Sequence, residues 1–144
     1  MTREQIDYIV LRMSEARTTL DDARSLFATG SMRSVVNRLY YACFYAASAV
    51  VCTTGARPRK HSGLLSAFGR DWVKTGQFPV QAANLLRQLF DLRMEGDYRV
   101  GNMPTKEEVG RLMEQAQGFL DETLGYVEKR LEEEPGADRQ STDL

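Results

Sequence analysis

An all-α fold, an up-and-down bundle of four to five helices, is predicted by three features of the sequence. Apolar residues recur at helical spacing along most of the chain, and no segment shows the strict alternation with β-branched enrichment that is typical of strands. Glycine and proline separate these helical segments. The connections are short, which favours helices packed against their neighbours. We therefore expect one helical domain over residues 1–134 and a disordered polar tail over 135–144.

The first helix is expected over residues 3–28. Thr2 and Gln5 can form a capping box at its start, and Gly30 follows its end. Its apolar positions form one stripe, which we expect to face the core. The stripe consists of Ile6, Ile9, Val10, Met13, Leu20, Ala23 and Phe27.

The second helix is expected to begin after Ser31 as its N-cap and to run to about Thr53. Its segment "LYYACFYAASAVVC", from Leu39 to Cys52, has no charged residue. A helix that is apolar on every side belongs in the centre of a bundle or in an interface. Such a helix is difficult for a monomer to bury completely, so we expect a homodimer.

The third helix is expected to be short, over residues 63–76, with Ser62 as its cap. The fourth is expected to follow Pro79 and to reach about residue 95, with "GDYRVGNMP" as a loop or frayed end. Its core stripe is Ala82, Leu85, Leu86, Leu89 and Phe90.

The fifth helix is predicted by a capping box of Thr105 and Glu108, directly after Pro104. Its apolar residues recur with helical periodicity to the end of the domain. They are Val109, Leu112, Met113, Ala116, Leu120, Leu124, Val127 and Leu131.

Composition excludes several classes of protein. A net charge of −1 argues against non-specific coating of nucleic acid, which needs a basic excess. Neither a membrane-spanning segment nor a signal peptide is expected. Cys43 and Cys52 are too far apart on one helix to be bridged, and free thiols fit a reducing cytoplasm. With one histidine and no Cys/His cluster, we expect no metal site and no cofactor.

Arg93 and Asp97 continue the helical stripe that contains Leu86 and Phe90. They can form an ordinary ion pair four residues apart at a helix end, contributing about 0.3 kcal/mol. They can also hold a guanidinium in a partly buried cleft that receives a phosphate. Position alone leaves these two interpretations open.

A second candidate group lies in the second helix. Asn37 and Arg38 can position a phosphate, and Tyr41 can stack against a base. The alternative is that Tyr40, Tyr41 and Tyr45 are core or interface residues with satisfied hydroxyl groups. The basic loop around Arg57, Arg59 and Lys60, with Arg70 further on, is expected to be a solvated surface. His61, the only histidine, is a secondary candidate because the sequence supplies no partner to orient it.

The segments "VVNRLYYACFYAASAVV", "PRKHSGLLSAFGRDWVKTGQFP" and "LFDLRMEGDYRVG" together resemble the HEPN family (higher eukaryotes and prokaryotes nucleotide-binding), in its small stand-alone prokaryotic branch. The resemblance covers about residues 35–127. It implies a helical bundle, usually homodimeric. It also implies a partner, a minimal nucleotidyltransferase, encoded alongside in a toxin–antitoxin-like or defence pair. Active members are metal-independent ribonucleases that use an arginine followed, after four to six residues, by a histidine.

On this resemblance the motif arginine falls on Arg93, and the motif histidine has no counterpart. Asp97 stands close to its place, and Tyr98 resembles a tyrosine that follows it in some members. An aspartate beside an arginine is ionised at neutral pH and cannot donate a proton well. Only His61 could replace the missing group, and it would have to come from another element or subunit, which we do not expect.

Whether Arg38 and Arg93 can form one site depends on the directions of the second and fourth helices. If all helices alternated strictly in direction, the second and fourth would be parallel, with Arg38 and Arg93 near opposite ends. The two groups can form one site within a chain only if the third helix lies crosswise, so that the fourth runs antiparallel to the second.

Three functions follow from these residues. The first is a non-catalytic partner of a minimal nucleotidyltransferase, with nucleotide or RNA bound through Asn37, Arg38, Tyr41, Arg93, Asp97 and Tyr98. The second is a weak metal-independent ribonuclease that uses Arg93 with Asp97, Tyr98 or His61. The third is a purely structural dimeric bundle in which Arg93 and Asp97 are a stabilising pair.

Overall fold

The computed structural model describes residues 1–98 and 103–135, and the side chains of residues 95–98 lie outside the described part. Its elements are α1 (Arg3–Thr29), α2 (Met32–Cys52), α3 (His61–Phe68), a π-helical turn η1 (Gly69–Val73), α4 (Val80–Tyr98) and α5 (Lys106–Glu132). The described residues contain no strand. The predicted all-α bundle is thereby confirmed.

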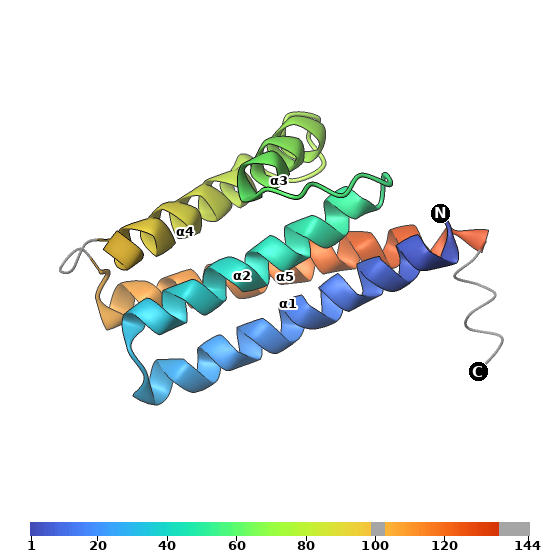
Figure 1. Ribbon diagram of the computed structural model, residues 1–144. Coiled ribbons are helices and arrows are strands. Elements are labelled where there is room, and N and C mark those ends of the chain that lie inside the picture. Colours follow the sequence, from blue (N-terminus) through green and yellow to red (C-terminus); the bar gives the residue numbers. More distant parts are fainter. Residues whose placement is uncertain (99–102, 136–144) are drawn as a thin grey trace.

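Helix α2 lies at the centre of the bundle. It contacts α1, α3, α4 and α5. Figure 1 shows α1 and α5 running beside α2, and α4 covering its remaining side. Residues such as Leu39, Tyr40, Cys43 and Ala46 have no exposed surface. The central position predicted from the uncharged segment is confirmed, and the homodimer stays a prediction.

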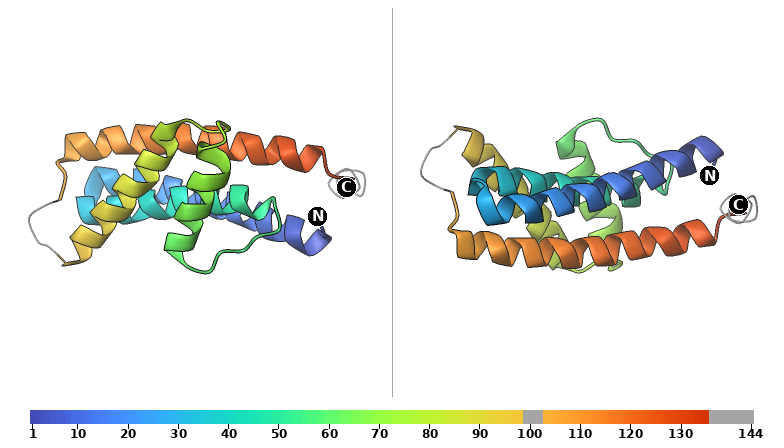
Figure 2. Two further views of the ribbon diagram at one scale, coloured as in Figure 1. Left: turned by 90° about the horizontal axis from the view of Figure 1, so that it is seen from above. Right: turned by 90° about the horizontal axis from the view of Figure 1, so that it is seen from below.

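Helix α3 lies across the long helices rather than along them (Figure 2, left). The chain therefore reverses through α3 and η1, and α4 runs back along α2 in the opposite direction (Figure 1). As a result the beginning of α2 and the end of α4 meet at one end of the bundle. The geometric condition for a single site within one chain is fulfilled.

By length and composition α2 is the one helix in the described chain that could cross a membrane, with a mean hydropathy of 1.3 over its most apolar window. Within this window, however, 72% of the residues are buried inside the protein. Burial of this kind is typical of the core helix of a soluble protein. Cys43 and Cys52, both on α2, are buried free thiols.

The helix starts follow the expected capping chemistry at three of the sites. The Thr2 and Gln5 capping box is formed at α1, and the Thr105 and Glu108 box is formed at α5. The Ser31 side chain accepts a hydrogen bond from the Ser34 amide at α2. These side chains satisfy amide groups that have no partner inside the helix.

Three local predictions are wrong. Ser62 is not the cap of α3, because that helix begins two residues earlier than predicted, at His61, with Lys60 at the N-cap and no side-chain cap bond. The expected third helix changes from α-helical to π-helical at Gly69. Val10 is 47% exposed, so the α1 stripe is narrower than expected. Helix α4 continues to Tyr98, so of the two predicted alternatives, a loop or a helix end, Asp97 and Tyr98 belong to a helix end.

The end of the chain is described only in part. The expected tail, 135–144, lies outside the described residues from position 136 onward. The predicted disorder of this tail stays a prediction.

Candidate functional site

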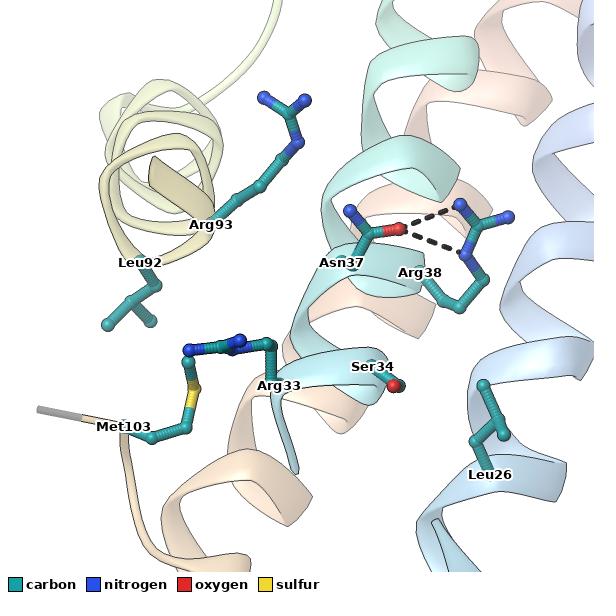
Figure 3. Close-up of a pocket in the computed structure, with 8 residues that line it drawn as sticks. All are labelled: Leu26, Arg33, Ser34, Asn37, Arg38, Leu92, Arg93 and Met103. Carbon is teal, nitrogen blue, oxygen red and sulfur yellow. Dashed lines mark hydrogen bonds between the residues drawn. The ribbon is translucent and has the colours of Figure 1, made fainter. Parts of the chain in front are cut away.

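A pocket of about 360 Å³ lies where the beginning of α2 meets the end of α4. Its lining residues are Leu26, Arg33, Ser34, Asn37, Arg38, Leu92, Arg93 and Met103. Figure 3 shows Arg93 extending from α4 toward α2, and Arg33 extending from α2 toward the side of α4 and Met103. We call this the arginine pocket.

The arginine pocket is positively charged. Arg33, Arg38 and Arg93 line it, and none of the lining residues in the described part of the chain is acidic. The ion pairs found among the described residues all involve other side chains. Three guanidinium groups from two helices provide donors and charge for an anion such as a phosphate.

Asn37 holds Arg38 in place. Its side-chain oxygen accepts hydrogen bonds from Nε of Arg38 at 3.2 Å and from an Nη atom at 2.7 Å. The guanidinium carbon of Arg38 also lies 5.5 Å from the centre of the Tyr41 ring. In Figure 3 the amide nitrogen of Asn37 points to the side of α4, where it can donate to the same anion as Arg93.

Arg93 lies over two aromatic rings of α2. Its guanidinium carbon is 5.4 Å from the centre of the Tyr40 ring and 5.1 Å from that of Tyr41. Its Nε is buried and has no hydrogen-bond partner among the described residues. One Nη atom lies 3.7 Å from Sδ of Met94, a weak acceptor. The aromatic faces therefore position the cation, and among the described side chains its strong donors meet no oxygen acceptor.

His61 is connected to this site through Tyr40. Its Nδ1 lies 2.9 Å from the Tyr40 hydroxyl. The His61 ring also packs on Phe44, with the ring centres 4.4 Å apart. The Tyr40 side chain is fully buried, and His61 is the only partner of its hydroxyl among the described residues. The hydroxyl proton therefore points to Nδ1, which leaves the proton of the neutral imidazole on Nε2.

The electrostatics keep both groups neutral at neutral pH. Burial lowers the pKa of His61, and the positive charge of Arg93 lowers it further. Burial raises the pKa of the Tyr40 hydroxyl, against the opposing effect of Arg93. His61 thus presents an N–H donor close to Arg93.

The structure brings together most of the predicted residues. Asn37, Arg38 and Arg93 line the same pocket, and Tyr41 lies beneath two of its guanidinium groups. The side chains of Asp97 and Tyr98 lie outside the described residues.

Outside the pocket, the basic loop remains at the surface. Arg57, Arg59 and Lys60 are exposed. Arg70 is also exposed and donates to the carboxylate of its neighbour Asp71 at 2.9 Å.

Sequence reasoning missed two residues of the site. Arg33 is not among the candidates chosen from the sequence, although it lies one turn before Asn37 on the same face. Tyr40 was assigned to the core, and it is a core residue that also orients His61. His61 was not expected to join Arg93, because the crosswise position of α3 is not visible in the sequence.

Comparison with known proteins defines the family. The sequence model of the HEPN domain matches residues 9–130. A UPF0332 protein of Thermotoga maritima is 39% identical over 118 residues, which cover 82% of this chain and 86% of that protein.

Two further relatives come from Methanocaldococcus jannaschii. "Putative toxin MJ0605" is 31% identical over 83% of this chain and 86% of its own length. "Putative toxin MJ0142" is 28% identical over 80% of this chain and 78% of its own length. The chain belongs to the HEPN domain family.

Proposed function

We propose that this chain is the HEPN member of a cytoplasmic toxin–antitoxin-like pair, and that its arginine pocket binds a phosphate group of a nucleotide or RNA. The partner in this proposal is a minimal nucleotidyltransferase, as the family resemblance implies. The names of the two relatives from Methanocaldococcus jannaschii support a role in such a pair.

One observation carries the phosphate-binding proposal. Arg33, Arg38 and Arg93 line one pocket, and none of its described lining residues is acidic. Such a cluster is electrostatically unfavourable unless an anion compensates it. The buried Nε of Arg93, which has no hydrogen-bond partner among the described residues, adds an oriented donor.

A binding role fits the chemistry of the site better than a catalytic one. Ribonuclease action without a metal requires one group that accepts a proton and one that donates it. With its proton on Nε2, neutral His61 donates a hydrogen bond and cannot accept a proton at that atom. Among the described residues of the site there is no second imidazole and no carboxyl group, so we propose recognition without cleavage.

Calorimetric titration with AMP tests phosphate binding. Wild type should bind, and Arg93→Gln should weaken binding by about tenfold or more, because it removes a charged hydrogen-bond donor. Arg87→Gln is the matched control, since Arg87 is an exposed arginine on the same helix. No binding by wild type, or equal loss in both variants, would refute the proposal.

The partner is tested by affinity purification of the tagged chain from a native lysate. A nucleotidyltransferase that co-purifies in a defined ratio supports the pair. If no such protein is recovered and no such gene lies next to this one, the pair is excluded.

A weak metal-independent ribonuclease is the second candidate, and the observation that favours it is that His61 and Arg93 both lie against the rings of Tyr40 and Tyr41. Purified protein should then cleave RNA in EDTA, and Arg93→Ala and His61→Gln should each abolish cleavage. Equal rates for wild type and both variants would show that the activity is a contaminant.

A further inference from the structure

A continuous series of aromatic rings and arginines leads away from the arginine pocket along α2. It begins at Arg38, passes over the half-buried rings of α2, and ends on α1 and the loop after α2. Its members are Arg38, Tyr41, Phe44, Tyr45, Arg12, Tyr8 and Arg57. We call it the arginine–aromatic strip.

The first half of the strip lies on one face of α2, because Arg38, Tyr41 and Tyr45 are spaced by three and four residues. The rings of Tyr41 and Tyr45 have their centres 6.0 Å apart. Phe44 lies beside both, at 6.2 Å from Tyr41 and 5.9 Å from Tyr45. Tyr41 also carries Arg93 on its face, so the strip is contiguous with the arginine pocket.

The second half crosses to α1. The guanidinium carbon of Arg12 lies 5.2 Å from the ring centre of Tyr45 and 5.0 Å from that of Tyr8. The guanidinium carbon of Arg57, in the loop after α2, lies 4.2 Å from the centre of the same Tyr8 ring. The strip therefore has an arginine at each end and a third, Arg12, between its rings.

The strip has the properties of a binding surface. The rings of Tyr8, Tyr41, Phe44 and Tyr45 are only partly buried, so they have faces or edges at the surface. Of its arginines only Arg12 is neutralised among the described residues, by Glu15 at 3.3 Å. Partly exposed rings interleaved with arginines offer stacking surfaces for bases and charges for the backbone between them.

We propose that the strip binds a single-stranded nucleic acid whose phosphate enters the arginine pocket and whose neighbouring bases stack along α2 toward Arg57. This inference rests on the proposed function, which it extends from one phosphate to a strand. Unpaired bases are required, because the bases of a duplex are stacked on each other and cannot reach the rings.

A second copy of the chain is a less favourable occupant. A two-fold interface places the same patch of both subunits face to face. The arginines of the strip would then meet the same arginines of the other subunit, with one paired carboxylate, Glu15, on each side. Like charges brought together in this way oppose association, whereas a polyanion is attracted by them.

Fluorescence anisotropy with a labelled single-stranded RNA of about 12 nucleotides tests the strip, a length within the range of about 4 to 16 nucleotides that a single OB fold covers. Tyr45→Leu keeps an apolar side chain and removes the stacking ring. Arg57→Ala removes an exposed charge that is no part of the core. Each should weaken RNA binding about tenfold. Arg59→Ala is the control, because the exposed Arg59 has no cation–π contact in the described chain.

Further arms identify the ligand. Binding of single-stranded RNA but not DNA of the same sequence assigns the strip to RNA, and equal binding assigns it to single strands of either kind. A duplex that binds as tightly as the single strand overturns the proposal. So does a Tyr45→Leu protein that sediments as a monomer where wild type is a dimer, with unchanged RNA affinity, because the strip is then a subunit interface.

The proposals for the strip and for the pocket can be refuted independently of each other. AMP binding by Tyr45→Leu and Arg57→Ala should match that of wild type, because neither residue lines the pocket. If wild type binds AMP and all variants bind RNA equally, only the strip is refuted. If wild type does not bind AMP but the strip variants lose RNA affinity, only the pocket is refuted.

Discussion

The hydroxyl of Tyr40 lies 2.9 Å from Nδ1 of His61 and joins the core of the bundle to the beginning of α3. Tyr40 is fully buried in α2, whereas His61 is only partly buried. Since the same Tyr40 ring lies under the guanidinium of Arg93, one core residue positions groups from two other helices. The contact occupies Nδ1 of His61 and leaves Nε2 without a partner among the described residues.

Tyr40→Phe removes this hydrogen bond and should lower the free energy of unfolding by about 1 kcal/mol. The ring and its packing are retained, so the loss of stability measures the contribution of the hydroxyl group. Urea denaturation at neutral pH measures it. Tyr41→Phe is the control, because the Tyr41 hydroxyl has no hydrogen-bond partner among the described residues. An equal loss in both variants would contradict the assigned role of Tyr40.

The pH dependence of stability follows from His61. Its pKa is lowered in the folded state, so the unfolded chain binds the proton more tightly. Stability from this group is therefore complete above the unfolded pKa of about 6.5 and is lost as the pH falls below it. Compared with His61→Gln, wild type should lose stability on acidification. If the stability of wild type relative to His61→Gln instead increased at low pH, the pKa of His61 would be raised by folding, and the prediction would be wrong.

The influence of Arg93 on His61 can be measured directly. The chain has one histidine, so its imidazole proton signals in an NMR titration need no assignment. The pKa of His61 should lie below its usual value in wild type and should rise in Arg93→Gln, because the positive charge is removed. Arg87→Gln should leave it unchanged. An unchanged pKa in Arg93→Gln would show that the two groups are not coupled.

The capping box of α5 makes an independent prediction about the fold. Thr105→Ala removes the oxygen that accepts from the Glu108 amide at 3.2 Å and should lower stability by about 1 kcal/mol. Thr18→Ala, at an exposed position inside α1, should change it by less than about 0.5 kcal/mol. Thermal unfolding compares the two. Similar losses would mean that the cap contributes nothing specific.

The helices were predictable because their signals are local. Capping boxes at Thr2 and Thr105 and the uncharged run of α2 depend on residues a few positions apart. The exposure of Val10 was not predictable, since it depends on which neighbouring helix covers that side of α1. The π-helical turn at Gly69 likewise has no sequence signature as clear as a cap.

The candidate site was predictable only in part. Periodicity placed Arg93 at the end of a core stripe and Arg38 at the start of α2, and the pocket contains both. Their meeting depends on the crosswise direction of α3, which is a tertiary property. The same property brings His61 to Tyr40, so the histidine was judged from its neighbours in sequence and its partner was missed.

The NMR signal of the Arg93 Nε–H group tests whether Arg93 binds a ligand or only forms an ion pair with Asp97. Its signal in a ¹H–¹⁵N correlation spectrum can be identified as the one missing in Arg93→Gln. On addition of AMP this signal should shift strongly, while that of the exposed Arg87 stays in place. A signal that does not move at saturating AMP would show that the guanidinium is engaged within the protein, and it would contradict phosphate recognition by Arg93.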